Sequence, residues 1–177
     1  MPLRCLWQVS LRRERVEIPP TSSALLDLPE SSGDAHVGYI RLSLFSHTAP
    51  GQVRAALRQI EAEQGVRGLI LDLRGNPGGL VNAGIETAAL FLPPGSPVLQ
   101  VVGRDTGRAE TIRLDDKLDA GRPVRNAEAA AAWGRPSELP LVVLVDEDSA
   151  SAAEILAGAL RDGGRAQARI DSLGVHL

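Results

Sequence analysis

The segment that most constrains this chain runs from Leu141 to Leu160. An apolar run, Leu141–Val145, is followed by an acidic turn, then by small residues, and then by apolar residues at helical spacing. This order predicts a buried strand, a sharp turn and a helix. The turn delivers Ser151 to the start of the helix, beside unpaired backbone N–H groups and in the positive field of the helix dipole. A serine nucleophile and the oxyanion formed by its attack need those two features.

A structural role explains the same residues. Ser151 and Glu154 have the spacing of a capping box, in which both side chains satisfy the N-terminus of a helix. Serine at such a position is more often a cap than a nucleophile. The local pattern therefore allows both interpretations, and on its own it favours the cap.

A second turn that is a candidate for a role in catalysis lies at Asp72–Leu80, which reads DLRGNPGGL. It follows the aliphatic run Leu69–Leu71 and precedes a predicted helix, and its glycines allow the backbone to approach a ligand closely. Their N–H groups can bind a developing negative charge, although a plain turn built from Gly and Pro is an equal alternative. The segment has neither the Gly-Lys-Ser/Thr of a P-loop nor the GxGxxG order of a dinucleotide fold.

The whole chain alternates strands with helices. Apolar patterns predict strands near residues 37–42, 66–73, 98–103, 109–114, 141–145 and 165–170, and helices near 49–64, 80–92 and 151–161. Residues 3–18 suit exposed strands, and the Pro- and Ser-rich residues 19–36 suit a loop. Such alternation indicates an α/β layered domain. Both turns follow buried strands, so we expect them to meet at the carboxyl ends of the sheet, where ligands bind.

Composition excludes several function classes. The chain has 177 residues, of which 44% are hydrophobic and only 3% aromatic, and its net charge is -3. These values argue against nucleic acid as a partner, because neither base stacking nor phosphate binding is supported. No apolar run is long enough for a transmembrane helix, and no signal peptide is recognisable at the N-terminus. No metal-ligand cluster is visible and no cofactor is expected, and the three histidines are isolated.

The two turn segments together resemble one known family. Asp72–Leu80 and Ser149–Asp162 (SASAAEILAGALRD) look like motifs of the carboxyl-terminal processing peptidases, also called tail-specific proteases. Val37–Phe45 also looks like the entry to that family's core, and the resemblance extends over about residues 37–169. It implies a layered α/β core of the Clp-protease and crotonase type and a serine endopeptidase with a Ser-Lys dyad. Its implied partners are C-terminal tails of proteins or peptides.

The resemblance also implies roles for individual residues. Ser151 matches the nucleophile, Ala152 supplies one oxyanion N–H, and Gly79 or Gly78 supplies the second. Glu154 matches the acidic position that supports the nucleophile.

Two features depart from the family pattern. The PDZ domain that normally precedes the core is represented only by residues 1–20, which resemble its exit strand. Residues 21–36 then form a linker, and residues 37–177 form a protease core that is truncated at its C-terminal end. The family's lysine lies in a glycine-rich turn downstream of the serine, where this chain reads IDSLGVHL and has no lysine. His176 lies about as far after Ser151 as the family's lysine lies after its serine, and Lys117 is the only lysine of the chain. The sequence leaves open whether either acts as a base.

These observations predict a serine endopeptidase core that acts on C-terminal tails. The alternative is an inactive, peptide-binding pseudoenzyme or gene fragment, because a serine without a base loses a proton-transfer step. A third possibility is a crotonase-like domain that binds acyl-CoA, since that fold also uses paired backbone amides. The family is typical of the periplasm or the thylakoid lumen, but the chain itself leaves its location unknown.

Overall fold

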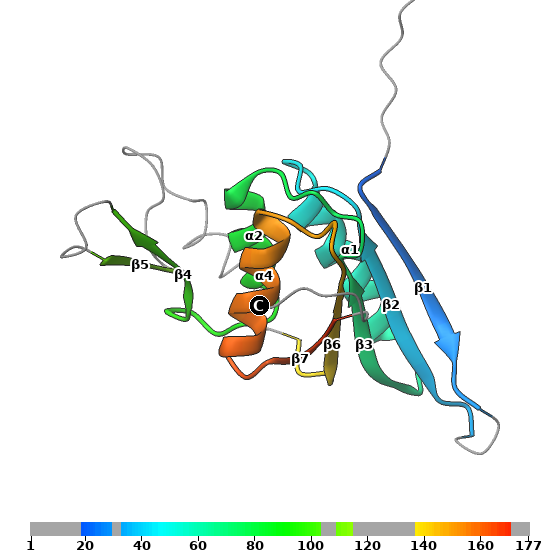
Figure 1. The fold of residues 1–177 in the computed structure, drawn as a ribbon. Coiled ribbons are helices and arrows are strands. Elements are labelled where there is room, and N and C mark those ends of the chain that lie inside the picture. The colour runs from blue at the N-terminus through cyan, green and yellow to red at the C-terminus, as the bar shows by residue number, and fades with distance from the viewer. Residues whose placement is uncertain (1–18, 30–32, 104–108, 115–136, 171–177) are drawn as a thin grey trace, which may run out of the picture.

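The computed structural model describes residues 19–29, 33–103, 109–114 and 137–170. Its main sheet has five strands in the order β1-β2-β3-β6-β7, and a second sheet pairs β4 with β5 (Figure 1). The elements are β1 (Thr21–Asp27), β2 (His36–Leu42), α1 (Ala49–Ala62), β3 (Val66–Asp72), α2 (Val81–Ala88), β4 (Pro97–Val102), β5 (Ala109–Arg113), β6 (Leu141–Val145), α4 (Ala152–Asp162) and β7 (Ala166–Ile170). The predicted α/β layered class is confirmed.

The centre of the main sheet is parallel. Strands β2, β3, β6 and β7 run in one direction, and only β1 is antiparallel to its neighbour. In the pairing of β3 with β6, Leu69 lies opposite Leu141 and Asp72 lies opposite Leu144. Because the strands are parallel and in register, the loops that follow β3 and β6 leave the same edge of the sheet side by side. The expected meeting of the two turns is therefore confirmed.

One face of the sheet forms the core. Ile40, Leu71 and Val143 are neighbours across β2, β3 and β6, and all three are buried. Helix α1 packs on β1 and β2, and α4 packs on α2 and β7. The core is almost wholly aliphatic, and a buried leucine such as Leu156 in α4 contributes about 1.5–3 kcal/mol through removal from water. This packing fixes the start of α4 relative to the sheet.

Two expectations about elements need correction. Residues 19–36 were expected to form a loop, but Thr21–Asp27 form the edge strand β1. Their pairing with β2, from Thr21 opposite Leu42 to Asp27 opposite His36, overrides the weak local strand signal. Helix α2 ends at Ala88 and not at residue 92. The next bonds, from the N–H groups of Leu90 and Phe91, reach back three residues and tighten the chain ahead of Pro93.

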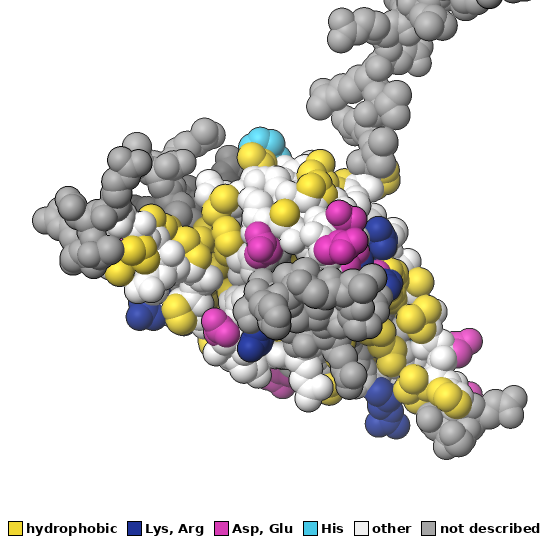
Figure 2. All heavy atoms as spheres, in the orientation of Figure 1, with side chains coloured by type: hydrophobic (Ala, Val, Ile, Leu, Met, Phe, Trp, Pro, Cys, Tyr) yellow, Lys and Arg dark blue, Asp and Glu magenta, His cyan; other side chains and the backbone are white. Residues whose placement is uncertain are grey.

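Exposed hydrophobic side chains gather in a few places. Figure 2 shows them along β1 and around the β4–β5 pair, where Leu25, Leu26, Val101 and Val102 are exposed. A further group, Leu44, Leu80 and Val81, lies in the two chain segments joined by a bridge between Phe45 and Gly79. Among the helices described, none has the length and apolar character needed to span a bilayer.

Candidate active site

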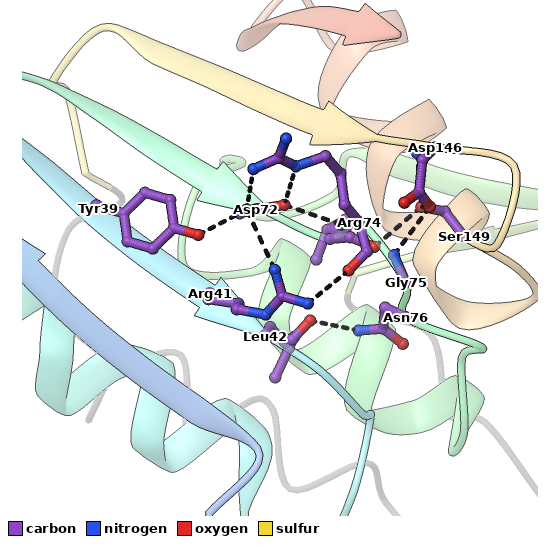
Figure 3. Close-up of polar contacts among 10 residues, drawn as sticks. Tyr39, Arg41, Leu42, Asp72, Arg74, Gly75, Asn76, Asp146 and Ser149 are labelled. Atoms are coloured by element: carbon purple, nitrogen blue, oxygen red, sulfur yellow. Dashed lines mark hydrogen bonds and ion pairs between the residues drawn. The ribbon is translucent and has the colours of Figure 1, made fainter. Parts of the chain in front are cut away.

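Hydrogen bonds join the turn after β3 to the turn after β6. The N–H of Gly75 donates to Asp146 Oδ1 at 2.8 Å, and Ser149 Oγ donates to the carbonyl of Leu73 at 2.9 Å (Figure 3). The N–H of Ala150 donates to the carbonyl of Asn76 at 3.0 Å. The glycine turn and the serine turn therefore form one hydrogen-bonded unit.

Sequence reasoning did not assign Asp146 or Ser149 to this unit. Asp146 Oδ1 also accepts from the N–H of Asp148 and from the hydroxyl of Ser149. The bond from the N–H of Gly75 is the main reason why the pKa of Asp146 lies below its usual value. The only signal in the sequence was a carboxylate directly after a buried strand, and its partner was 71 positions away.

Ser151 has a strained backbone. Its φ of 54° and ψ of −115° differ from the extended conformation of an ordinary N-cap. In the described residues it is the only position other than glycine with positive φ. Such a conformation costs on the order of 1–3 kcal/mol and persists where the surroundings enforce it, as in the sharp strand-to-helix turn that exposes a catalytic serine. The Ser151 side chain is exposed, as a nucleophile requires.

The capping interpretation of Ser151 and Glu154 is also satisfied. The pair forms a capping box at the start of α4, and the N–H of Ser151 donates to Glu154 Oε2 at 2.6 Å. This bond holds the peptide group that precedes the serine side chain. A capping role and a nucleophilic role are thus compatible for Ser151. The capping bond fixes its peptide group, while its side chain stays exposed.

The backbone amides around Ser151 differ in availability. The N–H of Gly78 donates to Asn76 Oδ1 at 2.8 Å, so it is already engaged. Phe45 donates its N–H to the carbonyl of Gly78, and Leu80 donates its N–H to the carbonyl of Phe45. Since a trans peptide directs its N–H opposite to its C=O, the N–H of Gly79 points away from Phe45. Within the described ranges no acceptor takes the N–H of Gly79 or of Ala152.

Gly78 lies directly against the serine. A Cβ added to it would be 2.7 Å from Ser151 Cβ, 2.7 Å from the carbonyl oxygen of Ala150 and 3.0 Å from the N of Ala152. Its φ of +95° also favours glycine. The structure therefore brings together Ser151, Gly78, Gly79, Ala152 and Glu154, the residues named from the sequence. In the described residues, the N–H groups of Gly79 and Ala152 are the ones without an acceptor at this turn.

A buried carboxylate lies at the same edge of the sheet. Asp72 has no exposed surface, and it accepts hydrogen bonds from Tyr39 Oη at 2.6 Å and Arg74 Nη2 at 2.8 Å, with Arg41 Nη1 at 3.5 Å (Figure 3). Burial raises its pKa, but the bonds from Arg74 and Tyr39 outweigh burial and lower the pKa to about 2. Asp72 is therefore a carboxylate at neutral pH, and it ties the end of β3 to β2.

This carboxylate predicts an acid-sensitive contribution to stability. The pKa of Asp72 is lower in the folded chain, so its contribution is present above the unfolded value of 3.8 and is lost as pH falls towards about 2. Because Arg41 and Arg74 are partly exposed, we expect the loss to be about 1–2 kcal/mol. Urea unfolding of wild type and Asp72→Asn at several pH values will show a steeper acid decline in wild type. Parallel curves would contradict this assignment.

The basic residues give no partner to Ser151 in the described part of the chain. His36 Nδ1 contacts Asp27 Oδ1 at 2.9 Å, and His47 is exposed before α1. Lys117 and His176 lie outside the described residues. Over those same residues, no group of three or more His, Cys, Asp and Glu side chains is placed to hold a metal ion.

The chain is similar to carboxyl-terminal processing proteases in both sequence and structure. The chain is 43% identical over 159 residues to the carboxyl-terminal-processing protease of Synechocystis sp., covering 90% of this chain and 32% of that protein. It is 40% identical over 162 residues to carboxyl-terminal-processing peptidase 3, chloroplastic, of Arabidopsis thaliana, covering 90% and 27%. The solved photosystem II D1 C-terminal processing protease superposes with a TM-score of 0.64 at 30% identity, covering 88% of this chain and 37% of that one.

The chain thus spans about a third of the length of these curated relatives. A sequence profile of Peptidase family S41 matches residues 36–169, which include both turns, strands β2, β3 and β6, and α4. On this match, and on the fold and the two joined turns, the chain belongs to peptidase family S41.

Proposed function

We propose that this chain is the core of a serine endopeptidase in which Ser151 is the nucleophile. The observation that carries the proposal is the backbone of Ser151, with φ of 54° at a turn held against Gly78. An ordinary helix cap needs no such strain, whereas an exposed nucleophile at a strand-to-helix turn does. Membership of family S41 supports the same role.

The proposed chemistry assigns each residue one task. Ser151 Oγ attacks a peptide carbonyl carbon, and the oxygen that becomes negative accepts hydrogen bonds from the N–H groups of Gly79 and Ala152. Ala152 is the first residue of α4, so the helix dipole adds to the stabilisation of that oxygen. Gly78 acts by giving room to the serine, and Glu154 acts by holding the N–H of Ser151.

The proton of the serine hydroxyl needs a base. The resemblance assigns this task to a lysine, and the sequence contains only Lys117. General-base catalysis contributes about 10²–10⁴-fold to rates, so the identity of the base determines how active residues 1–177 are. In the described residues Ser151 makes no hydrogen bond with a histidine or lysine, and His176 and Lys117 stay candidates for this role.

The proposed substrates are C-terminal tails of proteins, as the names of the relatives suggest for those proteins. Support comes from Leu44, Leu80 and Val81, which are exposed and belong to the two segments on either side of the Phe45–Gly79 bridge. An apolar tail passing Gly79 would cover these side chains. The protease core over residues 37–177, after a PDZ-like exit strand at 1–20, is proposed on the same basis and is supported by the family match over residues 36–169. The linker expected at 21–36 is not proposed, because Thr21–Asp27 form strand β1 of the main sheet.

Covalent labelling tests the nucleophile. We expect a fluorophosphonate to modify residues 1–177 at Ser151, as located by mass spectrometry, and Ser151→Ala to abolish the modification. Ser96→Ala is the control, because Ser96 is a partly exposed serine whose hydroxyl donates to the carbonyl of Pro93, and in the described residues it bonds to neither turn of the proposed site. If the folded wild type is not labelled, that result would support the inactive peptide-binding alternative. Binding of coenzyme A would support the acyl-CoA alternative.

A further inference from the structure

Asn76 is a buried polar residue, and each of its four polar groups makes a hydrogen bond. Its side-chain Nδ2 donates to the carbonyl of Leu42 at 2.8 Å, and its Oδ1 accepts from the N–H of Gly78 at 2.8 Å. Its own N–H donates to the carbonyl of Leu73 at 3.1 Å, and its carbonyl accepts from the N–H of Ala150 at 3.0 Å. The residue has no exposed surface, so water does not replace these bonds.

The four bonds reach the end of β2, the residue after β3 and both turns of the proposed site. Leu42 ends β2 and Leu73 follows β3, so two bonds anchor Asn76 to the sheet. Ala150 directly precedes Ser151, and Gly78 directly precedes Gly79. Asn76 therefore bonds to the residue directly before the serine. It also bonds to the residue directly before Gly79, whose amide would bind the oxyanion.

The chemistry of the side chain is specific for asparagine. The site needs a donor facing Leu42 and an acceptor facing Gly78, and a carboxamide provides both on one planar group. A carboxylate would place an acceptor against the carbonyl oxygen of Leu42. An apolar isostere would leave the buried carbonyl of Leu42 and the N–H of Gly78 without partners.

We propose that Asn76 is the positioning residue that sets the placement of the Gly79 amide relative to Ser151. This inference rests on the proposed function, because it gives Asn76 a role only through those two groups. It also differs from a purely structural role, in which loss of Asn76 would lower stability and leave the reactivity of the folded site intact.

A pair of buried polar residues separates the two roles. Thr87 in α2 is likewise buried and donates its hydroxyl to the carbonyl of Ala83 at 2.7 Å, but it bonds to neither turn. We expect Asn76→Ala to slow fluorophosphonate labelling of Ser151 by at least about 10-fold under conditions where circular dichroism shows a folded chain. We expect Thr87→Val to lower the free energy of unfolding by an amount of the same order as Asn76→Ala does. It should nevertheless change the labelling rate of Ser151 by less than about 2-fold. Equal effects on labelling, or none from Asn76→Ala, would overturn the proposal.

The conservative variant gives a pH signature. In Asn76→Asp the protonated carboxyl can again donate to Leu42 and accept from Gly78, whereas the ionised form cannot donate. Burial raises the pKa of the introduced carboxyl, so its labelling rate relative to wild type should recover as pH falls from about 8 to about 5.5. A relative rate that does not vary with pH would overturn the proposal.

Amide exchange provides a readout that does not depend on labelling. If the wild type is not labelled, that result counts against the proposed function. The exchange measurement alone then tests whether Asn76 holds the glycine turn. We expect the N–H of Gly78 to exchange at least about 10-fold faster in Asn76→Ala than in wild type, and unchanged in Thr87→Val. If Asn76→Ala does not fold, Asn76→Asp near pH 5.5 and pH 8 replaces it in the same measurement. Unchanged exchange at Gly78 would overturn the proposal.

Discussion

Replacing Gly78 by alanine is expected to lower the labelling rate of Ser151 by at least about 100-fold, the scale of losing one oxyanion donor. The added Cβ would lie 2.7 Å from Ser151 Cβ and from the carbonyl oxygen of Ala150. Neither neighbour is the free end of a flexible side chain, so the serine turn itself has to move. The strained φ of +95° adds on the order of 1–3 kcal/mol of destabilisation.

The control for this variant is Gly158→Ala in α4. Gly158 lies in the same helix that Ser151 caps, a Cβ there meets nothing within 4 Å, and its φ is not positive. Alanine should stabilise the helix by roughly 0.5–1 kcal/mol and leave labelling unchanged. Labelling at the wild-type rate in folded Gly78→Ala would show that the two turns do not share one site.

Peptide turnover by residues 1–177 is expected to be at least about 100-fold below that of a full-length relative such as the Synechocystis sp. protease. In the proposed site the amides and the helix dipole would stabilise an oxyanion, but they would not remove the proton of the serine. Loss of one member of a nucleophile–base pair can cost nearly as much as loss of both, because they act as a unit. Hydrolysis of a peptide with an apolar tail, followed by chromatography, measures this difference.

The same assay identifies a base if the expectation fails. Turnover at a normal rate that Ser151→Ala abolishes would contradict the prediction and show that a base is present. His176→Ala and Lys117→Ala would then be compared, and the variant that loses turnover would name it. A residual rate that Ser151→Ala leaves unchanged would be background hydrolysis, in agreement with the prediction.

Local patterns predicted the elements that carry a strong periodic signal. Val53, Ala56, Leu57 and Ile60 recur at helical spacing and all face the core from α1. Strand β1 was missed because Thr21–Asp27 are mostly exposed, so hydrophobic alternation does not mark them. Their strand conformation comes from pairing with β2, which no local window contains.

The motifs predicted which residues would meet at the site, but not which of their atoms would be available. Glycine at 78 and 79 looked equivalent in the sequence, yet only Gly79 keeps an open N–H in the described structure, because Asn76 engages that of Gly78. The role of Asn76 depends on Leu42 and Ala150, which are 34 and 74 positions away in the chain. Nor does a serine in a capping box reveal that its φ is positive.

The bonds between the two turns also set when the site can form during folding. Gly75 and Asp146 are 71 positions apart, and Ser149 and Leu73 are 76 apart. Closure of such long loops has to precede these contacts, so they belong to the slow, non-local part of folding. Until β6 is seated beside β3, nothing holds Ser151 in its strained conformation. A nascent or partly unfolded chain therefore carries Ser151 without its folded geometry, and the proposed nucleophile is assembled only when the two turns have met.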